Sequence, residues 1–124
     1  ISDYNEAIRL KPDYAEAYNN RGNAKLALGD KQGAINDFNQ AIRIKPDLAE
    51  VYLNRGLAKS DLGMIQSALE DLQEARRLSQ RNGDTTLHEK VLKEIRRISP
   101  YVFYDHGNTK VDLASTQSTS VDFQ

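Results

Sequence analysis

The sequence contains an internal repeat with a fixed spacing. Segment 13–46 is repeated, 34 residues later, by segment 47–80. The pairs of identical residues include Asp13/Asp47, Ala15/Ala49, Glu16/Glu50, Tyr18/Tyr52, Asn20/Asn54, Arg21/Arg55, Gly22/Gly56, Ala24/Ala58, Lys25/Lys59, Leu28/Leu62, Gly29/Gly63, Ala34/Ala68, Asp37/Asp71, Ala41/Ala75 and Arg43/Arg77. A period of this length predicts one supersecondary unit that is copied along the chain and packs only on its neighbours. Such a stack presents an extended surface, which favours binding over chemistry in an enclosed pocket.

The repeat reaches back to the first residue. Segment 1–12 matches segment 35–46, with identities at Ile1/Ile35, Asp3/Asp37, Asn5/Asn39, Ala7/Ala41, Ile8/Ile42, Arg9/Arg43, Lys11/Lys45 and Pro12/Pro46. The chain therefore opens on the second half of a unit, and we interpret it as a fragment of a longer array. Without the first half of that unit, Ile1, Tyr4 and Ile8 are expected to form an exposed apolar stripe at which copies of the chain associate.

Helix start and stop signals divide each unit into two helices. Asp13, Asp30 and Asp47 are predicted N-caps, whereas Gly29 and Gly63 are predicted helix ends. The expected helices span 15–28, 31–44, 48–62 and 65–79. A further amphipathic helix over 86–98 is expected to cover the last apolar surface of the stack.

The composition changes beyond Ser99 and Pro100. An aromatic and β-branched run at 101–104 precedes a stretch at 114–120 that is rich in Ser, Thr and Gln. We expect 99–124 to be an extended or flexible tail, of which 101–104 is the part suited to dock on the helices. The predicted fold class is all-α, with a C-terminal capping helix and an irregular tail.

Composition argues against several classes of function. The 124 residues carry a formal net charge of −1, which favours neither nucleic acid nor an anionic membrane as a partner. There is no Cys, and the two His, His88 and His106, lie in unrelated settings. Since no nucleophile motif or phosphate loop is found either, we predict no catalytic residue, no metal and no cofactor. The lack of Cys and of a visible signal peptide favours a cytoplasmic location.

The spaced residues of the two copies resemble the tetratricopeptide repeat family. The matching residues are Tyr18, Gly22, Ala34, Phe38, Ala41 and Pro46, then Tyr52, Gly56, Ala68, Leu72 and Ala75. The resemblance implies an α-solenoid of antiparallel helix pairs in a right-handed superhelix. Its units would be a second helix at 1–12, full units at 13–46 and 47–82, a capping helix at 83–98 and the tail at 99–124. The chain departs from the family where Arg21 and Arg55 replace Leu, Lys25 and Lys59 replace an aromatic residue, and Gln80 replaces the closing Pro.

The resemblance also implies a binding face. In this family the first helix of each pair lines a concave surface that holds an extended peptide or a partner's helix. The residues expected there are Asn19, Asn20, Asn23, Leu53, Asn54 and His88. Asn20, Asn54 and His88 are spaced by 34 residues, and an amide suits a peptide backbone because it both donates and accepts hydrogen bonds. The alternatives are that these Asn bond within the protein and that His88 is an ordinary helix-face residue.

Two related features limit the interpretation. Some family members grip a C-terminal carboxylate with Lys and Asn. Asn23 and Asn54 match two of those Asn positions, but Asn19 and Glu50 stand where Lys is needed. The repeated Arg21 and Arg55 are interpreted as structural partners of Asp37 and Asp71.

The leading hypothesis is a non-catalytic scaffold for protein–protein interaction, with a protein or peptide as its partner. One alternative is a repeat segment of a larger enzyme or assembly factor whose catalytic domain lies elsewhere. Another is a solenoid that self-associates through its open N-terminal half-unit.

Overall fold

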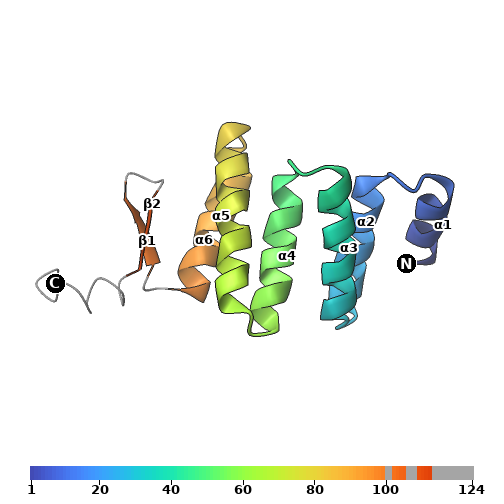
Figure 1. Ribbon diagram of the computed structural model, residues 1–124, viewed down its shortest axis with the longest axis horizontal. Coiled ribbons are helices and arrows are strands. Elements are labelled where there is room, and N and C mark those ends of the chain that lie inside the picture. Colours follow the sequence, from blue (N-terminus) through green and yellow to red (C-terminus); the bar gives the residue numbers. More distant parts are fainter. Residues whose placement is uncertain (100–101, 106–108, 113–124) are drawn as a thin grey trace, which may run out of the picture.

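The computed structural model describes residues 1–99, 102–105 and 109–112. Six helices and two short strands follow one another in these residues (Figure 1). Their bounds are α1 Ser2–Leu10, α2 Ala15–Ala27, α3 Lys31–Ile44, α4 Ala49–Asp61, α5 Ile65–Arg81, α6 Thr85–Ile98, β1 Val102–Asp105 and β2 Thr109–Asp112. The helices stand side by side along the long axis of the molecule, as the 34-residue period predicts for a helical-repeat solenoid.

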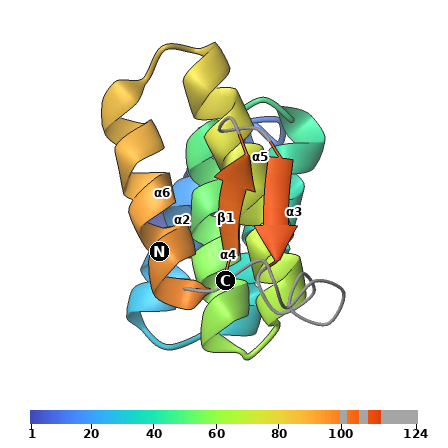
Figure 2. The same cartoon turned by 90° about the vertical axis from the view of Figure 1, so that its left-hand side faces the viewer.

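The helices form two layers. α2 packs on α3 and α4 packs on α5, while α3 against α4 and α5 against α6 join the successive pairs. Viewed along the stack, α2, α4 and α6 lie in one layer and α3 and α5 in the other (Figure 2). One core cluster holds Ala15, Ala34, Ile35, Phe38, Ala41, Val51 and Ala58, and the next holds Leu53, Leu69, Leu72, Ala75, Val91 and Ile95.

Each helix pair closes around a glycine. A Cβ atom placed on Gly22 would lie 2.6 Å from Phe38 Cε1, and one placed on Gly56 would lie 3.1 Å from Leu72 Cγ. Both distances are shorter than ordinary van der Waals contact, so the absence of a side chain at these two positions lets the paired helices approach closely. The predicted packing role of Gly22 and Gly56 is therefore confirmed.

Two of the predicted helix caps are wrong. Asp30 accepts a hydrogen bond from Gly33 N at 2.9 Å and caps α3, as predicted. The N-caps of α2 and α4, however, are Tyr14 and Leu48, and neither helix has a side-chain cap hydrogen bond. Asp13 and Asp47 lie one residue earlier, in the turns that follow Pro12 and Pro46. Each helix therefore begins one residue later than predicted, and the two carboxylates lie just before the capping position.

The helix ends follow the local residues. α3 ends at Ile44, two residues before Pro46, because a residue that precedes proline is disfavoured in helical conformation. The equivalent residue of the next unit is Gln80, and α5 continues through it to Arg81. Gly29 and Gly63 follow the C-terminal ends of α2 and α4 with φ of 87° and 82°, which is the left-handed conformation that glycine adopts readily.

The tail is partly regular. β1 pairs with β2 in antiparallel register, with Val102 opposite Asp112 and Asp105 opposite Thr109. The prediction of an irregular tail missed this pairing, although β-branched and aromatic residues at 102–104 favour extended backbone. The predicted docking segment 101–104 lies partly outside the described residues, since Tyr101 is not among them.

α1 is the least buried of the helices. It contains no buried residue, whereas the equivalent positions of α3 include the buried Ile35, Asp37, Phe38 and Ala41. Ile1 is 42% exposed and Leu10 is 68% exposed. Of the expected apolar stripe, Ile1 is exposed, whereas Tyr4 and Ile8 are partly buried.

Candidate functional site

A cavity opens between the N-terminal halves of the first helices of each pair. Its volume is about 250 Å³, and three helices, α2, α4 and α6, meet around it. The lining residues are Glu16, Asn19, Asn20, Asp47, Leu48, Ala49, Glu50, Val51, Asn82, Asp84 and Leu87. We call this the N-terminal groove. It lies on the layer that the sequence predicts to be the binding face.

Two of the predicted site residues line this groove. Asn20 is exposed and makes no side-chain hydrogen bond to another described residue, so its amide is available to a ligand. Asn19 is 6% exposed, and its Oδ1 accepts a hydrogen bond from Asn54 Nδ2 at 3.0 Å. This bond joins α2 to α4, and it is the intramolecular alternative that the sequence left open for Asn54.

The other predicted residues lie outside the groove. Asn23 is exposed on α2, one turn beyond Asn19. Leu53 is 1% exposed and packs in the second core cluster, so it supports the layer from behind instead of presenting a surface. The position of Leu53 in its helix predicted that it would lie on the binding face. Residues of α5 and α6 cover it instead, and the sequence of α4 alone does not show this.

His88 belongs to a separate hollow. A second cavity of about 250 Å³ lies between the end of α5 and the start of α6, lined by Ser79, Gln80, Gly83, Asp84, Thr85 and His88. His88 Nδ1 lies 3.4 Å from Ser79 Oγ. The 34-residue spacing therefore places Asn20, Asn54 and His88 on the three helices of one layer, but His88 lies beside Ser79 of α5.

The N-terminal groove is acidic. Four of its lining residues are Glu16, Asp47, Glu50 and Asp84, and no Lys, Arg or His lines it. This shared charge was not predicted, because the sequence was interpreted one position at a time, with Asp47 as a helix cap and Glu50 as a residue in place of Lys. The repeated identity of Glu16 with Glu50 was the available signal, since identical positions of successive units fall side by side in a stack.

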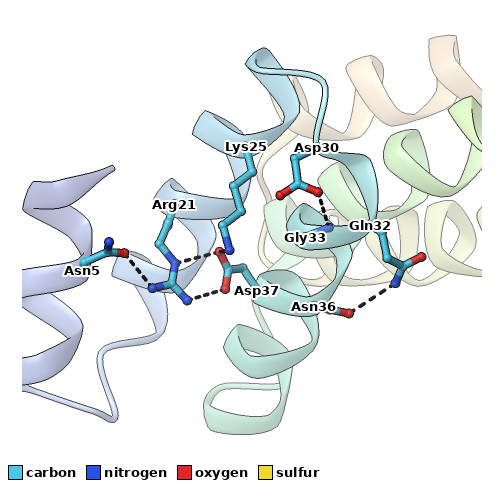
Figure 3. A network of polar contacts seen from close by, with 8 residues as sticks. All are labelled: Asn5, Arg21, Lys25, Asp30, Gln32, Gly33, Asn36 and Asp37. Carbon is cyan, nitrogen blue, oxygen red and sulfur yellow. Dashed lines mark hydrogen bonds and ion pairs between the residues drawn. The ribbon is translucent and has the colours of Figure 1, made fainter.

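A repeated network of hydrogen bonds and ion pairs joins neighbouring helices (Figure 3). Arg21 Nε and Nη2 donate to the two carboxylate oxygens of Asp37 at 2.8 and 2.7 Å, and Lys25 Nζ lies 3.1 Å from Asp37 Oδ2. Arg21 Nη1 donates to Asn5 Oδ1 at 2.8 Å. The guanidinium thus joins α1, α2 and α3. Its hydrogen bond to Asp37 raises the pKa of the Arg21 side chain above its ordinary value.

The second unit repeats this arrangement. Arg55 donates to Asp71 at 2.8 and 2.7 Å and to Asn39 Oδ1 at 2.8 Å, and Lys59 Nζ lies 3.1 Å from Asp71 Oδ2. The predicted pairing of Arg21 and Arg55 with Asp37 and Asp71 is confirmed. The Lys and Asn members were not predicted, although their identity at the 34-residue spacing was visible. The Arg and Lys residues at which this chain departs from the family pattern therefore act together, because both bind the same buried Asp.

Two further classes of site find no support in the part of the chain that the structure describes. It contains no group of three or more His, Cys, Asp or Glu side chains placed to hold a metal ion. None of its helices has the length and apolar character needed to cross a membrane.

Comparison with known families gives a match over most of the helical region. A family model described as TPR repeat matches residues 1–29 and 22–63, and one described as tetratricopeptide repeat matches residues 49–82. No curated protein matches the chain.

Solved structures with the same fold are similar to this chain. They include the TPR2B domain of yeast Sti1 in its pHsp70 complex, with 28% identity and a TM-score of 0.75 over 78% of each chain. The TPR2AB domain of yeast Sti1 in its pHSP90 complex is 28% identical with a TM-score of 0.73, covering 77% of this chain and 37% of that chain. The first TPR of Spaghetti (RPAP3), bound to the HSP90 peptide SRMEEVD, is 24% identical with a TM-score of 0.70, covering 78% of this chain and 72% of that chain.

Proposed function

Because this chain belongs to the tetratricopeptide repeat family, we propose that it is a protein-interaction scaffold whose layer of α2, α4 and α6 binds an extended segment of a partner protein. The observation that carries the proposal is the N-terminal groove, which lies on this layer and is lined by amide side chains. Two similar structures, at 28% identity, are complexes with pHsp70 and pHSP90, and they support a peptide as the partner.

The chemistry of the groove suits a peptide backbone. An extended peptide presents alternating N–H and C=O groups, and an amide side chain pairs with either one whatever the peptide sequence. Asn20 offers a free amide, and Asn23 lies on the same helix one turn further on. Asn54 contributes by holding Asn19 in place through the hydrogen bond between α4 and α2.

A grip on a C-terminal carboxylate is not part of the proposal. Such a grip needs cations, and Asn19 and Glu50 occupy the two positions at which the resemblance places Lys. Glu50 would repel a carboxylate. We therefore propose that an extended segment binds on the first helices, and we do not propose the ligands of the similar structures as its identity.

The amide contribution is tested by substitution. Asn20→Ala combined with Asn54→Ala is expected to weaken capture of a bound peptide about tenfold or more, since each hydrogen bond contributes about 0.5–1.5 kcal/mol. Asn36→Ala, an exposed change on α3, is the matched control. Peptides selected from a random library are titrated against the three proteins, and circular dichroism checks that helicity is unchanged. Equal affinities for the double variant and the control would remove the amides from the binding face.

We also propose limits to this function. The chain is a binding module without catalysis of its own, whether it acts alone or as the repeat segment of a larger enzyme or assembly factor. Its net charge of −1 favours neither nucleic acid nor a membrane as its partner, and we propose the cytoplasm as its location. The repeat boundaries proposed for it are 1–12, 13–46, 47–82 and 83–98, followed by the tail at 99–124.

A second copy of the chain is a further proposed partner. The observation that favours it is α1, where no residue is buried although the same positions in α3 form core. Asp3, which is equivalent to Asp37, is exposed and has no ion pair with a described residue. The side of α1 that carries Ile1, Tyr4 and Ile8 is proposed as the surface for this association.

A further inference from the structure

We infer that the segment bound in the N-terminal groove is basic, with Lys or Arg side chains that face Glu16 and Glu50. This inference rests on the proposed function and specifies the partner for that site. The groove has four acidic lining residues and no basic one. A segment rich in Asp or Glu would therefore meet charge of its own sign.

The acidic residues are more than helix caps. Glu16 and Glu50 lie in the first turns of α2 and α4, and Asp84 caps α6 by accepting a hydrogen bond from Leu87 N at 3.1 Å. A helix N-terminus carries about half a positive charge, so three such ends supply about +1.5. The four carboxylates together carry about −4 at neutral pH. The helix ends therefore offset less than half of the negative charge in the groove.

Five acidic residues outside the groove form ion pairs. Asp37 and Asp71 are each held by an Arg and a Lys. Glu residues on α1, α5 and α6 pair with an Arg three positions later, in the pairs Glu6–Arg9, Glu74–Arg77 and Glu94–Arg97. By contrast, Glu16, Asp47 and Glu50 form no ion pair with another described residue. Four carboxylates that have no ion pair with a described residue therefore line one groove.

A largely buried amide adds a hydrogen-bond donor to the groove. Asn19 is 6% exposed and lines the groove, and its Oδ1 is already bonded to Asn54. Its amide nitrogen makes no hydrogen bond to another described residue. The nitrogen is not among the buried atoms without a partner, so it is accessible from the groove. That N–H group is placed to donate to a backbone carbonyl of a bound peptide. The groove thus offers a side-chain N–H donor as well as its carboxylates.

The geometry favours several cationic side chains over a single metal ion. The acidic residues come from α2, from the residues that precede α4, from α4 itself and from the residue that precedes α6. No three of them are placed to hold one metal ion in the described part of the chain. Charges that are spread along a groove match charges that are spread along an extended segment.

The test uses the full chain and a random library of short peptides displayed on phage. The inference expects the selected peptides to be enriched in Lys and Arg and depleted in Asp and Glu. One selected peptide is synthesised with a fluorescent label, and a version with Lys and Arg replaced by Glu is made beside it. Glu16→Gln with Glu50→Gln is expected to weaken binding of the basic peptide about three- to tenfold, because exposed ion pairs are individually weak. Glu70→Gln, an exposed change on α5, is the matched control and leaves binding unchanged.

Salt provides a second measurement. Raising the ionic strength from about 0.1 M to about 1 M shortens the Debye length from about 10 Å to about 3 Å, which should weaken the wild-type complex more than the double-variant complex. Selected peptides that are neutral or acidic, or binding that ignores the double substitution, would overturn the inference and leave the scaffold function standing. A library that yields no binder at all would count against both.

Discussion

Gly22 and Gly56 occupy equivalent positions but face different neighbours. The Cβ of an alanine at position 22 would lie 2.6 Å from the ring of Phe38, a residue that is 0% exposed. At position 56 the nearest atoms are Ala68 O and Leu72 Cγ, both at 3.1 Å. The first contact requires the buried ring to move, whereas the second requires a shift of only a few tenths of an ångström.

We therefore expect Gly22→Ala to destabilise the fold by about 1–2 kcal/mol and Gly56→Ala to change it by less than about 1 kcal/mol. Overpacking costs about 1–3 kcal/mol, and replacing a helical glycine by alanine recovers up to about 1 kcal/mol. Urea unfolding measures both variants. Phe38→Leu copies the second unit, so the double variant Gly22→Ala/Phe38→Leu should lose little beyond Phe38→Leu alone. Equal losses for Gly22→Ala and Gly56→Ala would show that the ring does not set the limit.

Single residues of the candidate site were only partly predictable. The spacing of Asn20 and Asn54 placed them on one layer, and the structure agrees because equivalent residues of stacked units align. The hydrogen bond of Asn54 to Asn19 and the burial of Leu53 depend on how closely α4, α5 and α6 approach one another. A side chain's distance from a neighbouring helix is not encoded in the period of its own helix, so these two features required the structure.

Helices and their joints form the next scale. Each of the two networks bonds an Arg of one first helix to an Asp of its own pair and to an Asn of the preceding helix. Asp37 is the buried centre of the first network, with its side chain 4% exposed. Removing its charge leaves Arg21 and Lys25 facing each other without a counter-ion.

Asp37→Asn is accordingly expected to cost about 2–4 kcal/mol of unfolding free energy, since breaking a buried ion pair leaves an uncompensated charge. Asp71→Asn should cost a similar amount. The chain supplies its own control in Asp3→Asn, which changes the equivalent residue of α1, exposed and outside any network. Thermal and urea unfolding compare the three variants. A loss at Asp3→Asn as large as that at Asp37→Asn would show that the network does not account for the effect.

At the scale of elements, the sequence predicted most of the helices and missed the strands. The 34-residue period and the glycine stops placed α2 to α5 to within a few residues, because these signals act locally. The caps at Asp13 and Asp47 failed because a turn after each proline moved the helix start by one residue. β1 and β2 were missed because two short strands stabilise each other only after they pair, and neither is strongly marked alone.

The whole molecule has unlike ends. α1 matches the second helix of a repeat unit, and α6, the last helix in the described residues, matches the first helix of one. Joining these ends head to tail would complete a pair. However, Lys90 of α6 stands where Gly22 and Gly56 stand in the other first helices, and Glu89 stands where Arg21 and Arg55 stand. Glu89 would face Asp3, and the Lys90 side chain would block the close approach.

Association is therefore expected to give a closed dimer through α1 and no longer chains, since an interface that uses the same surface on both copies closes on itself. Light scattering over a range of concentrations should show monomer and dimer only. Tyr4→Lys with Ile8→Glu is expected to leave monomer, while Ile65→Glu, which changes an apolar residue that is 41% exposed elsewhere, keeps the dimer. A monomer at high micromolar concentration, or an open polymer, would contradict the proposed use of α1.

α6 carries Glu89 at the position where α2 and α4 carry the arginines that bind Asp37 and Asp71. This difference bears on how readily α6 detaches from the stack. In a stack where each element packs mainly on its neighbours, an end element such as α6 detaches more readily than an inner helix. Detachment of α6 uncovers Leu53 and Leu72 and removes one wall of the N-terminal groove. A peptide that binds only the closed form raises the free energy of opening, by about 2.7 kcal/mol when it is present at about a hundred times its Kd. Filling the groove with peptide should therefore increase the protection of α6 amides from hydrogen exchange. Both measurements report the same equilibrium between attached and detached α6, and the bound partner stabilises the attached form.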